Sequence, residues 1–293
     1  MVCFSLREVK EYALVMIRIS ADSTCDLSPE LLERFSVAIT PLSITVGEEV
    51  FRDGVDIHPV DVFRFVSEGK ICQTGAVNIY EYQNHFQKLT ANGDQVIHVC
   101  LGSSFSSCYN NALLAARDFS NVAVIDSKNL SSGSGHLVYD AALMASGGLD
   151  LLEIKKSLEA TVQKIDASFV IDQLDYLAKG GRCSAITAQG AKILRLKPCI
   201  EVRDGAMIVG RKYRGTFDKA LKLYVLDRLR INGGLDPSRV FITEAGCDQE
   251  VVAMVRSLVE ENADFEEIIV TKAGCTISNH CGPNTLGVLF KRL

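Results

Sequence analysis

Residues 96–116 read VIHVCLGSSFSSCYNNALLAA, and this stretch indicates the fold more clearly than any other. The apolar run 96–101 is typical of a strand buried on both faces, and the segment 110–116 is typical of a packed helix. The serines between them therefore fall at a helix N-terminus. Unpaired backbone N–H groups, the helix dipole and hydroxyl donors meet there, so this turn is a candidate site for a carboxylate or phosphate. The alternative is that a serine only caps the helix and the turn binds no anion.

Two further units of strand, polar turn and helix begin near residues 17 and 122, with polar turns at 22–26 and 126–127. Alternation of short apolar strands with helices predicts an α/β fold, in which helices flank a parallel sheet on both sides. Ligands of such sheets bind at the carboxyl ends of the strands. All three polar turns fall at that edge, so we expect them to share one crevice.

The pattern changes past residue 165. Asp204-Gly205 lies between two apolar runs within residues 199–209, which predicts a hairpin with a primed turn. The later elements are expected to be a helix at 217–229, a strand at 240–243, a helix at 251–261 and a strand at 268–271. We therefore expect three parts: an N-terminal extension over 1–15, an α/β domain over 16–165 and an α+β domain over 166–293.

Composition restricts the function classes. The 293 residues are 47% hydrophobic and 23% charged, as in globular proteins, and the net charge of -5 argues against nucleic acid or anionic membranes as partners. No apolar run approaches the roughly 20 residues that span a bilayer, so integral membrane association is not expected. The ten cysteines are scattered, which favours reduced thiols and a cytoplasmic location. We expect Met16 to be the native start.

Two segments outside the serine-rich turn are candidates for ligand binding. Gly180 and Gly181 predict a helix C-cap that frees Arg182 to hold a carboxylate or phosphate; the alternative is an ordinary surface arginine. Residues 276–283 (TISNHCGP) are expected to form a loop that carries His280 as a donor or base, or as a solvated histidine. Metal binding by His280 with its neighbouring cysteines is disfavoured, because no Cys-x-x-Cys pair is present.

An enzyme that processes an ester or a small carbonyl compound is the alternative function. It would use Ser106 or Ser103 with His280, and Asp22 or Asp126 as the acid. The chain has no Gly-x-Ser-x-Gly elbow, which argues against a common hydrolase class. It also has no dinucleotide fingerprint after a strand and no Walker loop, so we expect no nucleotide cofactor.

Nine motifs in one order resemble the DegV family of bacterial fatty-acid-binding proteins, from about Met16 to the end of the chain. They are Ala21-Asp22-Ser23-Thr24-Cys25-Asp26-Leu27, Asp53-Gly54-Val55-Asp56-Ile57, Thr74, Ser103 to Tyr109, Ile125-Asp126-Ser127, Lys179-Gly180-Gly181-Arg182, Leu196-Lys197-Pro198, Asp204-Gly205 and His280-Cys281-Gly282-Pro283.

The resemblance implies a two-domain protein that encloses one fatty acid in an apolar tunnel between the domains. It assigns the carboxylate to Thr74, to Ser106 or Ser103, and to His280, with Arg182 close by. It further implies that a separate fatty acid kinase uses ATP to convert the presented acid to an acyl phosphate for phospholipid synthesis. The binding protein would then be no enzyme and would need no cofactor or metal.

The chain departs from the family pattern around the expected headgroup. Residues 74–78 are TGAVN where the family usually has TSQPS, and residues 106–109 are SSCY where it usually has SGTY. The last motif ends in Asn284 instead of a second glycine. A different small acid or a shorter acyl chain is therefore an alternative ligand. Thr74 itself is expected in the loop before a helix capped by Asn78.

Overall fold

The computed structural model describes residues 15–181, 196–230 and 234–293. Its N-terminal half contains a four-stranded parallel sheet with the order β2-β1-β6-β7. These strands are Ala38–Thr40, Ile17–Asp22, Gln95–Cys100 and Val122–Asp126. The buried strand that we predicted in the opening stretch is therefore β6. Of the expected N-terminal extension, all but Val15 lies outside the described residues.

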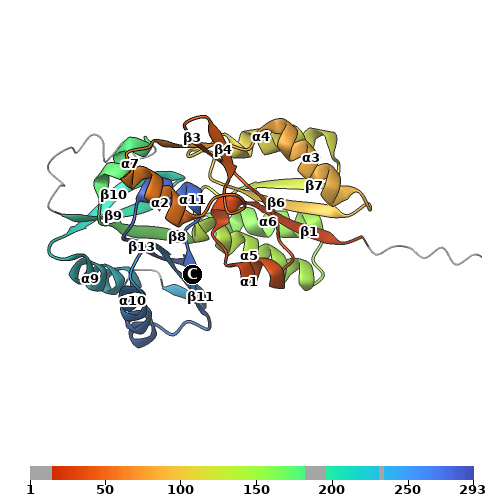
Figure 1. The fold of residues 1–293 in the computed structure, drawn as a ribbon. Coiled ribbons are helices and arrows are strands. Elements are labelled where there is room, and N and C mark those ends of the chain that lie inside the picture. The colour runs from red at the N-terminus through yellow and green to blue at the C-terminus, as the bar shows by residue number, and fades with distance from the viewer. Residues whose placement is uncertain (1–14, 182–195, 231–233) are drawn as a thin grey trace, which may run out of the picture.

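Helices cover both faces of this sheet, as predicted for an α/β fold. Figure 1 shows α3 and α4 on one side and α5 and α6 on the other. The helices of this half are α1 (Pro29–Arg34), α3 (Ile79–Thr90), α4 (Cys108–Ala115), α5 (Ser132–Ser146) and α6 (Leu151–Val162), with short 3-10 turns η1 (Ser23–Cys25) and η2 (Ala116–Asp118). The crossovers between consecutive parallel strands bring the polar turns to one edge of the sheet.

The helix starts follow local capping signals. The Ser28 side chain accepts a hydrogen bond from the backbone of Leu31, and proline occupies the first helical position of α1. Asn78 and Asp150 each form a capping box with a glutamate three residues later, at the starts of α3 and α6. These three starts were predicted from the sequence. A capping side chain satisfies N–H groups that have no partner within the helix.

A three-stranded antiparallel sheet was not predicted. It has the order β4-β3-β5, with strands Glu49–Arg52, Ser43–Val46 and Cys72–Gly75. Helix α2 (Pro59–Ser67) lies between β4 and β5 in the chain. Thr74 lies on β5 and pairs with Ile44 of β3. The expectation that Thr74 lies in a loop was therefore wrong.

The C-terminal half contains a six-stranded mixed sheet with the order β10-β9-β8-β13-β11-β12. Its strands are Ala206–Tyr213, Lys197–Arg203, Ile165–Ile171, Thr285–Arg292, Leu235–Ala245 and Ile268–Lys272. Its helices are α7 (Leu174–Gly180), α9 (Phe217–Leu229) and α10 (Gln249–Asn262). The predicted hairpin is β9–β10, and both turn residues have positive φ, 51° at Asp204 and 78° at Gly205, as a type I′ turn requires.

Residues 275–281 form a helix where the sequence predicted a loop. Helix α11 (Cys275–Cys281) connects β12 to β13 and carries His280 in its last turn. Its residue types have low helix propensity, and Gly274 at the N-cap position offers no capping side chain. The loop prediction failed because the groups that hold this helix come from distant parts of the chain.

One hydrophobic core extends across both large sheets. It joins Ile97 and Val99 of the parallel sheet to Phe169 and Leu289 of the mixed sheet. A second core packs α9 and α10 on the opposite face of the mixed sheet, and a small third core lies between the three-stranded sheet, α2 and α11. The domain boundary at residue 165 stays a prediction. No helix within the described ranges is long and apolar enough to cross a bilayer.

Candidate functional site: a cavity between the two large sheets

A cavity of about 240 Å³ lies where the carboxyl edge of the parallel sheet meets the mixed sheet; we call it the inner cavity. The turns that follow β6 and β7 line it from one side. Strands β8, β11 and β13 line it from the other, and helices α7 and α11 also contribute. Of the three polar turns expected to share one crevice, only the serine-rich turn contributes its own residues to the wall, at Phe105, Ser106 and Ser107. After β7 the wall is formed by Leu130 and Ser131, which lie beyond the turn at 126–127, and residues 22–26 do not contribute.

Most of the wall of the inner cavity is apolar. Its large apolar side chains are Leu42, Leu101, Phe105, Leu130, Phe169, Leu177, Met207, Ile277 and Leu289. These side chains offer an alkyl chain dispersion contacts and removal from water. The lining is thus typical of a site for a hydrophobic molecule.

Thr74 and His280 form a polar pair in this wall. The Thr74 Oγ1 and the His280 Nε2 lie 2.9 Å apart and share a hydrogen bond, although the residues are 206 positions apart. Thr74 comes from β5 and His280 from α11, so the pair joins the three-stranded sheet to the C-terminal half. A hydroxyl and an imidazole at one place can supply hydrogen-bond donors for a carboxylate oxygen.

Ser106 also lines the inner cavity, at the start of α4. Its Oγ accepts a hydrogen bond from the backbone N of Cys108 at 3.2 Å, and it is half-buried. Ser103 is exposed and does not contribute to the cavity wall; its hydroxyl donates to Asp126 Oδ2 at 2.6 Å. Arg182 lies outside the described residues. The structure therefore brings Thr74, Ser106 and His280 to one cavity.

A second cavity of about 720 Å³ adjoins the polar pair; we call it the outer cavity. Thr74 and His280 line both cavities, so they lie at the boundary between the two. The outer cavity also carries Lys70, Tyr176 and Lys179, and both lysines are exposed. A group held by the pair thus has an apolar space on one side and a space with two ammonium groups on the other.

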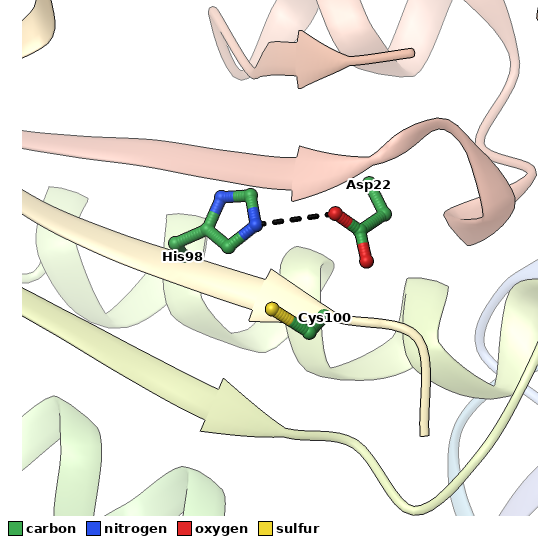
Figure 2. A group of neighbouring side chains, drawn as sticks. All are labelled: Asp22, His98 and Cys100. Carbon is green, nitrogen blue, oxygen red and sulfur yellow. Dashed lines mark hydrogen bonds and ion pairs between the residues drawn. The ribbon is translucent and has the colours of Figure 1, made fainter. Parts of the chain in front are cut away.

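A buried polar cluster lies within the parallel sheet. Figure 2 shows Asp22 at the end of β1 facing His98 and Cys100 of β6, and their potential ligand atoms all lie within 4.8 Å. Both Asp22 oxygens already accept hydrogen bonds, Oδ1 from the Tyr82 hydroxyl at 2.5 Å and Oδ2 from the backbone of Leu101 at 2.8 Å. We therefore interpret the cluster as a hydrogen-bonding network that fixes the serine-rich turn.

The network continues away from the cavity. Ser20 Oγ lies 2.8 Å from His98 Nδ1 and 2.7 Å from His85 Nε2. Burial, followed by the neighbouring His98, lowers the pKa of His85 to about 3, so this imidazole is neutral at physiological pH.

The two acids considered for a serine hydrolase do not contact His280 through these hydrogen bonds. Asp22 contacts His98, and Asp126 contacts Ser103.

The two cysteines of α11 behave as buried thiols. Burial raises the pKa of Cys281 to about 12 and also raises the pKa of Cys275. Cys275 Sγ donates to the carbonyl oxygen of Ile57 at 3.2 Å. Both thiols are therefore protonated near neutral pH.

Comparisons with known proteins agree with this fold. A family model described as an uncharacterised protein, DegV family, matches residues 16–292. A DegV domain-containing protein of Caldanaerobacter subterraneus subsp. tengcongensis is 32% identical over 278 residues, which cover 94% of this chain and 98% of that protein.

Two solved structures share the architecture. A DegV family protein from Thermus thermophilus, described by its fatty acid binding, has a TM-score of 0.85 at 26% identity and covers 95% of this chain and 100% of its own. A stearic-acid-binding protein from Eubacterium ventriosum has a TM-score of 0.80 at 28% identity and covers 94% of this chain and 98% of its own. Together with the family match over residues 16–292, these likenesses identify the chain as a member of the DegV family.

Proposed function

We propose that this protein binds one long-chain fatty acid, with the acyl chain in the inner cavity and the carboxylate at Thr74 and His280. The observation that carries the proposal is the hydrogen-bonded pair of Thr74 and His280 in an otherwise largely apolar wall. The fatty acid binding described for the similar proteins of Thermus thermophilus and Eubacterium ventriosum supports it. Ser106 is the third proposed donor, and Arg182 is proposed near the mouth of the site.

The energetics favour this arrangement. Burying a carboxylate costs several kcal/mol unless donors face it, and the pair with Ser106 supplies such donors. Each methylene group removed from water contributes about 0.8 kcal/mol, so the acyl chain provides most of the affinity. Affinity should therefore rise stepwise from octanoate to palmitate. A polar pocket for a small carbonyl substrate would show no such increase.

We further propose that the protein is a carrier and not an enzyme. The outer cavity gives the carboxylate an exit toward Lys70 and Lys179, where a phosphoryl group from ATP on a separate fatty acid kinase would be received. The ammonium groups would favour approach of that anion. The product would be an acyl phosphate for phospholipid synthesis.

Two experiments test the proposal. Isothermal titration with saturated fatty acids of increasing length tests binding, and a flat response to chain length would contradict it. Incubation of the oleate-loaded protein with ATP and a bacterial fatty acid kinase, followed by hydroxylamine trapping, tests presentation. Formation of hydroxamate only when both proteins are present is the expected result. Hydroxamate made by this protein alone would show that it is an enzyme.

A further inference from the structure

The first turn of α11 is held by an aspartate from the N-terminal half of the chain. Asp53 Oδ1 accepts a hydrogen bond from the backbone N of Cys275 at 2.8 Å, and Oδ2 accepts one from the backbone N of Thr276 at 3.0 Å. Asp53 is only 2% exposed, so water competes little for these bonds. The helix therefore receives its cap from a residue 222 positions earlier.

A glycine makes room for this arrangement. The backbone N of Gly274 donates to Asp26 Oδ1 at 2.9 Å, so the side chain of a second aspartate lies at the same helix start. A Cβ atom at position 274 would lie 3.1 Å from that oxygen and 3.4 Å from Asp53 Oδ1. Acceptor oxygens are favourable here because the first N–H groups of a helix have no partner within it and carry partial positive charge.

The three-stranded sheet thereby holds both members of the polar pair. Asp53 directly follows β4, Thr74 lies on β5, and both strands pair with β3. Thr74 is thus fixed by the sheet itself, whereas His280 is fixed through Asp53 and α11. The 2.9 Å contact of Thr74 with His280 therefore joins a strand of this sheet to a helix whose start receives its cap from the same sheet.

Two further contacts show that α11 packs as part of this small sheet. The Asn279 Nδ2 donates to the carbonyl oxygen of Cys72 on β5 at 3.2 Å. Cys275 shares the third core with Ile44 and Val62. These contacts hold the helix along its length, while the Asp53 hydrogen bonds fix its start.

We infer that Asp53 is a positioning residue for the carboxylate site: by capping α11 it holds His280 against Thr74 and so sets the preference for a free acid over a neutral headgroup. This inference rests on the proposed function. It assigns a role to the motif at residues 53–57, because the proposed binding site alone does not account for that motif.

The test is a double-mutant cycle read out with two ligands. Asp53→Asn keeps the size of the side chain but replaces one acceptor with an N–H₂ group that opposes a backbone N–H. We expect oleate affinity to fall about tenfold, while affinity for oleyl alcohol stays unchanged, because only the acid needs His280 in place. In a His280→Ala background the same Asp53→Asn change should have little further effect on oleate binding.

Asp56→Asn is the matched control, since Asp56 lies in the same segment and pairs with Arg52 at the surface. Equal losses for oleate and oleyl alcohol, or a full Asp53→Asn effect without His280, would overturn the inference. If Asp53→Asn folds poorly, Asn279→Ala loosens the same helix at its other end and should give the same acid-selective loss. Failure of the unmodified protein to bind either ligand would instead refute the proposed function.

Discussion

Replacing Thr74 by valine removes one hydroxyl from the proposed carboxylate site and changes little else. Valine has nearly the same shape as threonine and is well suited to a strand, so β5 should keep its pairing with β3. The change deletes the Oγ1 atom that lies 2.9 Å from His280 Nε2. The carboxylate then loses one donor, and the His280 Nε2 loses this one hydrogen bond when the site is empty.

The expected cost follows from the lost hydrogen bond, which is partly buried. Removing one donor to a charged group costs about 1–3 kcal/mol, which corresponds to a loss of roughly 5-fold to 150-fold in affinity for oleate. Affinity for oleyl alcohol should fall less, because a hydroxyl headgroup depends less on a charge-assisted donor. The inner cavity keeps its apolar wall, so the contribution of the acyl chain should not change.

The assay is competition against a fluorescent fatty acid, run with oleate and with oleyl alcohol. Thr45→Val is the matched control, because Thr45 lies on the adjacent strand β3 and does not contribute to the wall of the inner cavity. Unchanged oleate affinity in Thr74→Val, or the same loss in Thr45→Val, would refute the placement of the carboxylate.

Three further predictions concern other parts of the molecule. Ser106→Ala should weaken oleate binding by about 1 kcal/mol whereas Ser103→Ala should not, because only Ser106 lines the inner cavity; titration calorimetry checks this, and equal effects would contradict it. Leu289→Ala should lower the unfolding free energy by about 2–5 kcal/mol, because Leu289 is buried in the wall of the cavity. Chemical denaturation measures this loss, and saturating oleate should stabilise the variant by mass action. A loss of unfolding free energy below about 1 kcal/mol would contradict tight packing around Leu289. Burial, with Asp53 nearby, raises the pKa of Asp26 from 3.8 to about 8, so the folded state binds this proton more tightly than the unfolded chain. The free energy of unfolding should therefore fall as the pH rises from about 4 to about 8, by up to about 1.4 kcal/mol per pH unit. Asp26→Asn should make this dependence on pH less steep. Denaturant titrations at several pH values test it, and an unchanged slope would contradict the assignment.

Local signals predicted much of the fold. The strand β6, the three N-terminal helix caps and the β9–β10 turn each depend on residues close together in sequence, and the structure confirms them. A periodic or capping pattern within about ten residues carries this information. The α/β and α+β organisation followed from the order of these elements.

The elements that complete the site carry no such local signal. Strand β5 (CQTG) contains no large apolar side chain, and β3 (SITV) alternates buried and half-buried residues over only four positions. Their pairing joins residues about 30 positions apart, which no local pattern marks. Helix α11 depends on Asp53 for its cap, so residues 275–281 alone resemble a loop. The sequence analysis named His280 and Thr74 as candidates, and the structure brings their side chains together. It places both on a different kind of element from the loops that were predicted.

The most direct test of the central claim is native mass spectrometry of the protein purified from bacterial cells, followed by extraction and identification of any bound molecule. We expect one fatty acid per chain in the unmodified protein, and less or no bound fatty acid in the Thr74→Val variant. If the protein is purified empty and takes up neither palmitate nor oleate when these are added, it is not a fatty acid carrier.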